Sequence, residues 1–213
     1  MLRVIMLLVT KREANNQLTL YKMEYILIFI SAVFVNNIVL TQFLGICPFI
    51  GVSKKIGPAV GMSVAVSFVM VIATLVTFLM QKYVLEPFDL EYLQTISFIL
   101  IIAALVQMVE IVLKKVSRAL YRALGVFLPL ITTNCIILGV AIIVIQKGFD
   151  LPTSLVYAVS TAIGFGLALI IFSGIREQLS RTRLPKSIEG TPAALIIAGI
   201  LAMAFMGFAG IVK

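Results

Sequence analysis

The chain has 213 residues, of which 62% are hydrophobic and 12% charged, with a mean hydropathy of +1.16. Soluble domains are about 45–50% apolar and about 25% charged, so this composition excludes a water-soluble domain and predicts that a lipid bilayer is the solvent. The net charge of +8 does not indicate nucleic acid, because most basic residues lie between apolar runs, and the absence of His excludes histidine-dependent catalysis.

Residues 1–22 are expected to be an extension in front of the membrane part of the chain. Their apolar stretch is too short to cross a bilayer, and they carry four basic residues against one acid. We interpret Met23, which directly precedes Glu24 and the first long apolar run, as the natural start. The alternative is a cytoplasmic amphipathic tail. Residues 23–213 are then a single membrane domain.

Six apolar runs in this domain are longer than the about 18–20 residues that cross a hydrocarbon core. They cover residues 24–52, 58–81, 93–113, 119–146, 152–175 and 191–212. The predicted fold is therefore an all-α integral membrane protein with six transmembrane helices.

The five loops between these runs divide by charge. The first, third and fifth loops (53–57, 114–118 and 176–190), together with Arg122, hold ten Lys and Arg residues. The second and fourth loops (82–92 and 147–151) hold only two. By the positive-inside rule the odd-numbered loops are cytoplasmic, so both termini of the native chain face outward.

The first and fourth runs are longer than a bilayer needs, and both contain residues that lipid-facing helices avoid. These residues are Asn36, Asn37, Gly45, Cys47 and Pro48 in the first run, and Pro129, Thr133, Asn134 and Cys135 in the fourth. Proline removes a backbone donor and glycine eases departure from helical geometry, while Asn and Thr side chains can satisfy the freed backbone groups. We therefore predict that both helices are discontinuous.

The two interrupted runs also resemble each other. Placing Cys135 on Cys47 aligns CIILGV with CPFIGV and puts Gly139 on Gly51. With three spans per half, about 23–113 and 119–213, the halves would insert in opposite senses as an inverted repeat. Matched interruptions in inverted halves indicate a functional centre near the bilayer midplane. The alternative is that such residues only allow close helix packing, which is how we interpret Gly164 and Gly166.

The two cysteines allow three alternatives, which are a disulfide, inert buried thiols or metal ligation. A disulfide needs an oxidising compartment, and a bilayer shelters its thiols from the oxidising machinery. An iron–sulfur cluster normally takes four thiolates, whereas this chain has two and no His to replace the others. If Cys47 and Cys135 bind a cluster, a second subunit must supply two further ligands, most simply a related protein across a pseudo-two-fold axis.

The stretches that run from Asn36 to Pro48 and from Leu128 to Cys135 resemble the A-type membrane subunit of the Rnf (Rsx) ion-translocating electron-transport complexes. They are also similar to the E-type subunit of the sodium-translocating NADH:quinone oxidoreductase. The resemblance covers residues 23–213. It implies a homologous partner subunit of opposite topology and a [2Fe–2S] cluster between the two, with Cys47 and Cys135 as this chain's iron ligands. The residues that would support this site are Asn36, Asn37, Gly45, Pro48, Thr133 and Asn134.

The resemblance further implies a translocase subunit with no complete active site and no catalytic residue of its own. The complex would move electrons between NADH and ferredoxin or another acceptor and couple this to Na+ or H+ translocation across a bacterial inner membrane. Flavin and NADH would be bound by other subunits.

Two competing interpretations remain open at the level of sequence. A cofactor-free secondary transporter or channel would place a cation site at the broken helices, coordinated by Asn36, Asn37, Thr133 and Asn134. A structural subunit would carry two inert thiols. Only the cluster interpretation predicts iron that disappears when either cysteine is removed.

Overall fold

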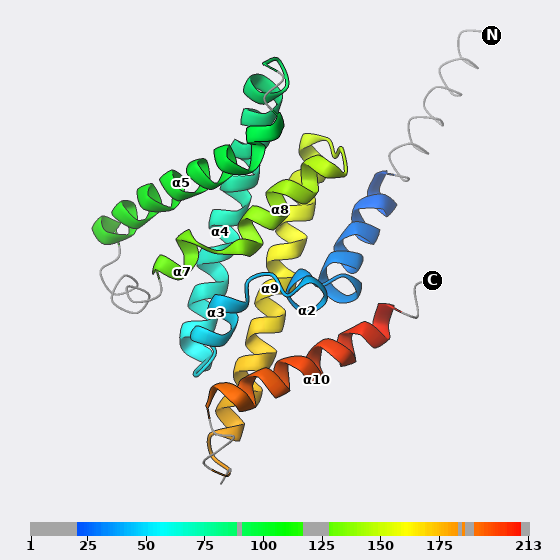
Figure 1. Ribbon diagram of the computed structural model, residues 1–213. Coiled ribbons are helices and arrows are strands. Elements are labelled where there is room, and N and C mark those ends of the chain that lie inside the picture. The colour runs from blue at the N-terminus through cyan, green and yellow to red at the C-terminus, as the bar shows by residue number, and fades with distance from the viewer. Residues whose placement is uncertain (1–20, 89–90, 117–127, 183–184, 186–189, 210–213) are drawn as a thin grey trace, which may run out of the picture.

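The computed structural model describes residues 21–88, 91–116, 128–182, 185 and 190–209. All regular elements in these ranges are helices, which confirms the predicted all-α class (Figure 1). Within these described ranges, four helical stretches are long and apolar enough to cross a membrane, namely Ile56–Leu85, Gln94–Val112, Pro129–Gln146 and Leu151–Leu179. Most of the predicted extension, residues 1–20, lies outside the described residues.

The elements follow the chain in a simple order. Residues 21–30 are helical and lead into the π-helix η1 (Ser31–Val35), α2 (Ile38–Gln42) and α3 (Ile46–Gly51). Next come α4 (Ile56–Met80), η2 (Gln81–Leu85), η3 (Glu91–Leu93) and α5 (Gln94–Val116). The last are α7 (Leu128–Thr132), α8 (Cys135–Gln146), α9 (Leu151–Leu179) and α10 (Thr191–Ala209).

The long helices begin close to their predicted starts, but three of them end later. The helix that contains α4 continues through η2 to Leu85, α5 continues to Val116 and α9 continues to Leu179. Lys82 and Arg176, which we expected in loops, therefore lie on helices. The prediction ended each span at its first charge, whereas a helix can pass the edge of the hydrocarbon while its basic side chains extend toward the headgroups. The loop limits were wrong for this reason.

The centre of the described bundle is the packing of α4 against α9 (Figure 1). Small residues line the contact: a Cβ added to Gly166 would lie 3.4 Å from the Cβ of Ser63. The close approach of the two backbones confirms the interpretation of Gly166 as a packing residue. Around this pair, α8 and α5 pack on α4, while η1 packs on α9 and α10 contacts η1 and α2.

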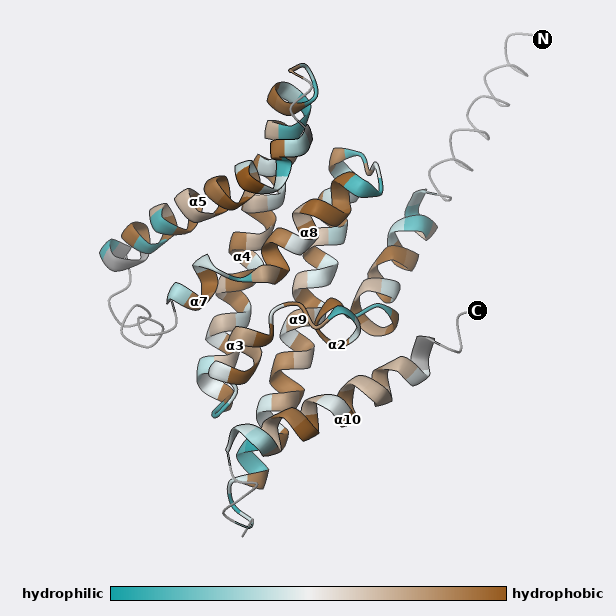
Figure 2. Ribbon diagram, in the orientation of Figure 1, coloured by the Kyte–Doolittle hydropathy of each residue, from teal (hydrophilic) through white to brown (hydrophobic). Residues whose placement is uncertain are grey.

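The outward faces of the bundle are strongly apolar. Figure 2 shows hydrophobic residues along most of the long helices, with hydrophilic residues at their ends and near the short elements α2 and α7. The exposed large hydrophobic side chains in the described parts of α5 and α10 are Ile96, Ile99, Leu100, Met108, Ile111, Val112, Leu195, Ile196, Ile200, Met203 and Met206. Such faces would be unfavourable in water and fit contact with lipid or with other membrane helices.

Asn37 joins the first helical segment to α9. Its side chain is 1% exposed, and its Nδ2 donates to the carbonyl oxygens of Gly164 at 2.8 Å and of Val33 at 3.2 Å. Its Oδ1 accepts the Val39 N–H at 3.2 Å and thereby caps α2. Both amide protons and the amide oxygen are therefore used. This buried group satisfies backbone atoms on both sides of the break and on a distant helix.

The absence of a side chain at Gly164 makes this contact possible. A Cβ there would lie 3.0 Å from the carbonyl oxygen of Ala32, 3.2 Å from the Cα of Val33 and 3.3 Å from Nδ2 of Asn37. Two of these three atoms belong to backbone, which cannot shift cheaply. The packing interpretation of Gly164 is confirmed.

Gly164→Ala should lower the free energy of unfolding by about 1–3 kcal/mol, because the added methyl group overpacks the η1 contact. Gly174→Ala is the matched control in the same helix, since a Cβ at Gly174 meets nothing within 4 Å. The control should be neutral or stabilising by up to about 1 kcal/mol, because alanine favours helix over glycine. Unfolding in detergent followed by helical circular dichroism measures both, and equal stabilities of the two variants would refute the packing account.

Asn37→Ala should lower the free energy of unfolding by about 2–4 kcal/mol, since it removes a helix cap and the buried side-chain hydrogen bonds to the Val33 and Gly164 carbonyls. Asn37→Asp keeps the capping oxygen but cannot donate, so it should also destabilise. Asn36→Ala is the control, because Asn36 is exposed and its Nδ2 donates only to the exposed Ser31 hydroxyl at 3.2 Å. The same unfolding assay should find less than about 0.5 kcal/mol for the control.

Candidate functional site

The first candidate region is the break in front of Cys47. α2 ends at Gln42, and the chain reverses through Phe43 with φ 55° and Gly45 with φ 80° before α3 begins at Ile46. Phe43 is the only non-glycine residue with a positive φ among the described residues. The left-handed backbone at Gly45 suits glycine because it has no Cβ. Cys47 thus lies in the first turn of a helix that starts inside the protein.

The second candidate region is the break in front of Cys135. α7 ends at Thr132, and α8 begins at Cys135 with Asn134 as its N-cap. The Asn134 side chain is 3% exposed, and its Oδ1 accepts the Ile136 N–H at 3.2 Å. This is the cap that Asn37 makes on α2. Each broken segment therefore uses one buried asparagine to begin a new helix.

The two breaks meet each other. The backbone N–H of Gly45 donates to the Sγ of Cys135 at 2.9 Å, although the residues are 90 positions apart in the sequence. A Cβ on Gly45 would lie 3.4 Å from Oδ1 of Asn134, so a larger residue would press on the cap of α8. The start of the Cys47 helix is therefore fixed against the start of the Cys135 helix.

A reciprocal contact accompanies this hydrogen bond. A Cβ on Gly139 would lie 2.7 Å from Cδ1 of Leu44, and one on Gly51 would lie 3.3 Å from Cδ1 of Leu130. Leu44 of the first segment thus packs on Gly139 of the second, and Leu130 of the second packs on Gly51 of the first. Gly51 and Gly139 are the pair that the sequence alignment superposed.

Both cysteines are free thiols, with Cys47 exposed and Cys135 half-buried. Among the described residues no group of three or more His, Cys, Asp or Glu side chains is arranged to hold a metal ion. This part of the chain therefore offers two soft sulfur donors and no further ligand of those types. One donor already accepts a backbone hydrogen bond and the other faces the protein surface.

A buried amide beside Cys135 has unused hydrogen-bonding capacity. Nδ2 of Asn134 is shielded from solvent and has no hydrogen-bond partner among the described residues. An orphaned donor in an apolar protein costs free energy unless something accepts from it. Asn134 directly precedes Cys135, and Gly45 lies against both residues.

The other predicted site residues are divided between structural and peripheral positions. Pro48 is buried within α3, and its carbonyl accepts the Val52 N–H at 3.0 Å. Thr133 is exposed and donates to the Pro129 carbonyl at 3.0 Å. The side-chain amide of Asn37 makes hydrogen bonds to Val33, Val39 and Gly164, and that of Asn36 donates to Ser31. Gly45, Asn134 and Cys135 come together directly, whereas Asn36 and Thr133 do not join them.

The sequence analysis did not predict a cleft beside the first helix. A cleft of about 600 Å³ runs along the first helix and the α8–α9 turn, where Glu24, Ser31, Asn36, Lys147 and Tyr157 contribute to its lining. The sequence signal was weak because these polar residues are scattered over three segments. Asn36 thus belongs to this cleft rather than to the thiol site.

Comparison with known proteins agrees with the resemblance drawn from the sequence. The family model described as Rnf-Nqr subunit, membrane protein, matches residues 25–212. The chain is 57% identical over 188 residues to the A subunit of the Na(+)-translocating ferredoxin:NAD(+) oxidoreductase complex of Acetobacterium woodii, covering 88% of this chain and 98% of that one.

Two further relatives are each named as the A subunit of an ion-translocating oxidoreductase complex. The relative from Syntrophotalea carbinolica is 57% identical over 88% of this chain and 97% of its own length. The relative from Shewanella oneidensis is 51% identical over 89% of this chain and 99% of its own length. With its apolar helices, the chain is a multi-pass membrane protein. It belongs to the Rnf-Nqr family of membrane-protein subunits.

Proposed function

We propose that this chain is the membrane subunit of a redox-driven ion pump in which Cys47 and Cys135 hold one side of a [2Fe–2S] cluster. The observation that carries the proposal is the 2.9 Å hydrogen bond from the Gly45 N–H to the Cys135 sulfur. It ties together two helix starts that each carry one cysteine. The two other thiolates would come from a homologous partner subunit of opposite topology.

The residues at the two breaks fit such a cluster as half of a site. Cysteine thiolates are the usual ligands of [2Fe–2S] centres, which take four of them. Cys47 is exposed, so a partner subunit could cover it, whereas Cys135 is already half-buried by this chain. The cluster would accept and release a single electron when bound.

The surrounding groups of this chain are suited to negative charge on the thiolates. Cys135 is the first residue of the twelve-residue helix α8, where the helix dipole favours an anion. The Gly45 N–H donates to its sulfur, and Nδ2 of the preceding Asn134 has no hydrogen-bond partner among the described residues. Donors to the ligand sulfurs stabilise added negative charge and so raise a reduction potential.

We further infer six spans in an inverted repeat. The segment 21–51 and α10 would be two further spans, in addition to the four long apolar helical stretches. The reciprocal packing of Leu44 on Gly139 and of Leu130 on Gly51 supports a pseudo-two-fold relation between the breaks. The segment 21–51 and the pair α7 and α8 would be the two discontinuous helices. The Lys-rich and Arg-rich odd loops would face the cytoplasm of a bacterial cell with this chain in the inner membrane.

The relatives suggest the reaction of the whole complex. One is named for a Na(+)-translocating ferredoxin:NAD(+) oxidoreductase, and others are named for ion-translocating oxidoreductases. By analogy this chain would belong to an oxidoreductase that couples electron transfer between ferredoxin and NAD to movement of Na+ or H+. Subunits that bind flavin and NADH would supply the remaining redox groups.

The structure gives no particular support to a cofactor-free cation site at the breaks. The side-chain oxygens of Asn37 and Asn134 already accept the N–H groups of Val39 and Ile136. An oxygen that caps a helix is less available to a cation, which needs several unoccupied oxygens around it. The transporter interpretation therefore rests on Asn36, which lines a separate cleft, and on the exposed Thr133.

Replacing Cys47 or Cys135 by Ala should remove about two iron atoms and matching sulfide from the purified complex, because each variant breaks one side of the cluster. Electron transfer through the complex should stop. Iron analysis and electron paramagnetic resonance of the reduced complex measure the first effect, and ferredoxin-dependent NAD reduction measures the second.

Thr133→Ala is the matched control for the cysteine variants, since Thr133 is exposed beside the same break. It should retain the iron and the spectrum. Full iron content and turnover in either cysteine variant would exclude the cluster. Assembled complex with unchanged spectra but no turnover would instead favour a structural role for the thiols.

Gly45→Ala should lower the reduction potential of the cluster, because a Cβ at φ 80° shifts the N–H away from the Cys135 sulfur. Gly148→Ala is the control, since Gly148 also has a positive φ (61°) but a Cβ there meets nothing within 4 Å. Both variants carry a left-handed alanine, which costs about 1–2 kcal/mol. Redox titration should find a shifted potential only for Gly45→Ala, and equal potentials would refute the role of this hydrogen bond.

A further inference from the structure

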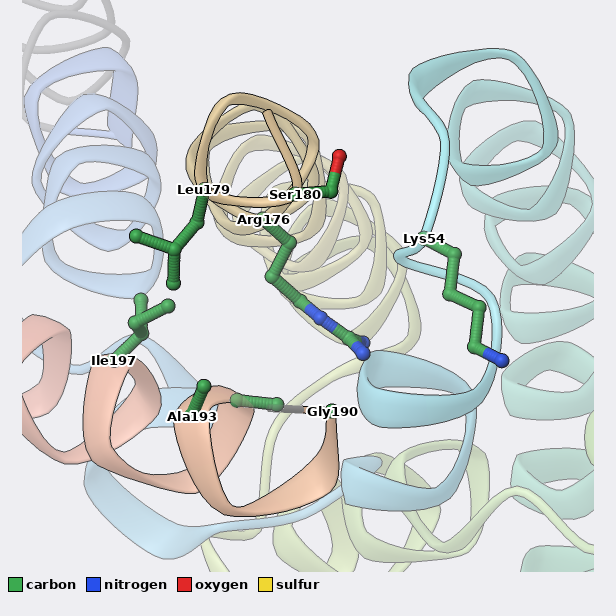
Figure 3. Close-up of a pocket in the computed structure, with 8 residues that line it drawn as sticks. Lys54, Arg176, Leu179, Ser180, Gly190, Ala193 and Ile197 are labelled. Atoms are coloured by element: carbon green, nitrogen blue, oxygen red, sulfur yellow. The ribbon is translucent and has the colours of Figure 1, made fainter. Parts of the chain in front are cut away.

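A separate cavity of about 230 Å³ lies where the end of α9, the start of α10 and the loop after α3 meet (Figure 3). Its lining combines two cationic side chains, Lys54 and Arg176, with the Ser180 hydroxyl and the backbone at Gly190. The remaining lining residues are apolar, and none of the described lining residues is acidic. The cavity is therefore positively charged at one side and apolar at the other.

The Arg176 guanidinium is held in place by the protein. Its Nη1 donates to the Ile50 carbonyl and to the Ser53 hydroxyl, both at 2.7 Å, and its Cζ lies 5.7 Å from the centre of the Phe172 ring. Figure 3 shows this side chain extending from α9 into the space between α10 and the loop that carries Lys54. A guanidinium fixed in this way loses little conformational entropy when it binds an anion.

Within the part of the chain that the structure describes, Arg176 has unused donors and no carboxylate partner. Its Nε and Nη2 groups have no hydrogen-bond partner among the described residues, and no described carboxylate lies within salt-bridge distance of it. The neighbouring Glu177 is occupied elsewhere, since it accepts the Ile56 N–H at 3.3 Å and pairs with Arg181 at 3.7 Å. The free edge of the guanidinium can therefore bind a planar or tetrahedral oxyanion with two parallel hydrogen bonds.

Two further features favour an anion at this place. Lys54, on the loop after α3, adds a second positive charge to the lining of the cavity. The nineteen-residue helix α10 begins beside Gly190, whose φ is 94°, so the positive end of its dipole adds to the field of the two side chains. These charges come from three different elements that border the cavity.

The apolar wall indicates that the ligand is an amphiphile. Leu179 from α9 and Ile197 from α10 line the cavity together with two alanines of α10. Inorganic phosphate has no apolar part that could contact this wall, whereas the glycerol and acyl carbons of a lipid would cover it. The cavity also lies at the end of the bundle that carries Lys54, Lys55 and Arg181, where anionic headgroups are attracted.

We propose that this cavity binds the phosphate of an anionic phospholipid, with Arg176 and Lys54 as the charged contacts and the α9–α10 wall against its apolar part. The site is independent of the two cysteines. Because Arg176 also fixes the end of α3, the lipid would bear on the same segment that carries Cys47.

The proposal is tested by native mass spectrometry of the full chain in detergent, titrated with phosphatidylglycerol or with phosphatidylcholine of identical acyl chains. Phosphatidylglycerol should bind more tightly. Lys54→Gln should weaken its binding about fivefold, as expected for one basic residue at a membrane surface, and Arg176→Lys should weaken it through loss of the two-pronged contact.

Lys55→Gln is the matched control, since it removes the same charge from the next residue, which does not line this cavity. Its affinity for phosphatidylglycerol should stay at the wild-type value. Equal affinity for the two lipids, or equal weakening by Lys54→Gln and Lys55→Gln, would overturn the site. Displacement of the lipid by inorganic phosphate at comparable concentration would assign a free-anion site and overturn the lipid assignment. If Arg176→Lys does not fold, the comparison of the two lysine variants still decides the question.

Discussion

Backbone groups between the short helices of a membrane protein have to find hydrogen-bond partners inside the protein, because lipid offers none. In the first segment Asn37 meets this need by bonding Val33 and Gly164 with its amide nitrogen and Val39 with its amide oxygen. The contact requires Gly164 to have no side chain, so α9 must carry a glycine where η1 crosses it. Once α2 is fixed in this way, the turn at Phe43 and Gly45 brings the next helix start to the Cys135 sulfur.

α9 also fixes the other end of this segment. Arg176 lies twelve residues, or about 18 Å of helix, beyond Gly164 and bonds the last turn of α3 and the loop after it. One long helix therefore anchors both ends of the segment that presents Cys47. This arrangement explains why an element of short helices and left-handed residues can hold a thiol in a defined place, and it links the proposed lipid site to the proposed redox site through a shared support.

Much of the helical arrangement was predictable, because long apolar runs have few alternatives in a membrane. The runs 58–81, 93–113 and 152–175 correspond to α4, α5 and α9, and Asn, Gly and Pro indicated where the short elements lie. The alignment of Gly51 with Gly139 also indicated two equivalent positions, and in the structure each of these glycines packs against a leucine of the opposite segment. The π-helices at Ser31–Val35 and Gln81–Leu85 were not predictable, since they depend on packing rather than on apolar pattern. The Gly45–Cys135 bond and the cavity at Arg176 join residues far apart in sequence, so no local pattern could reveal them.

The proposed redox role requires this chain to hold half of a four-thiolate site. Iron and acid-labile sulfide should therefore be measured in the full chain purified alone and purified together with its homologous membrane partner. The chain alone should bind essentially none, and the pair should bind about two iron atoms. A complete cluster on the chain alone, or a pair without iron after anaerobic reconstitution, would contradict it.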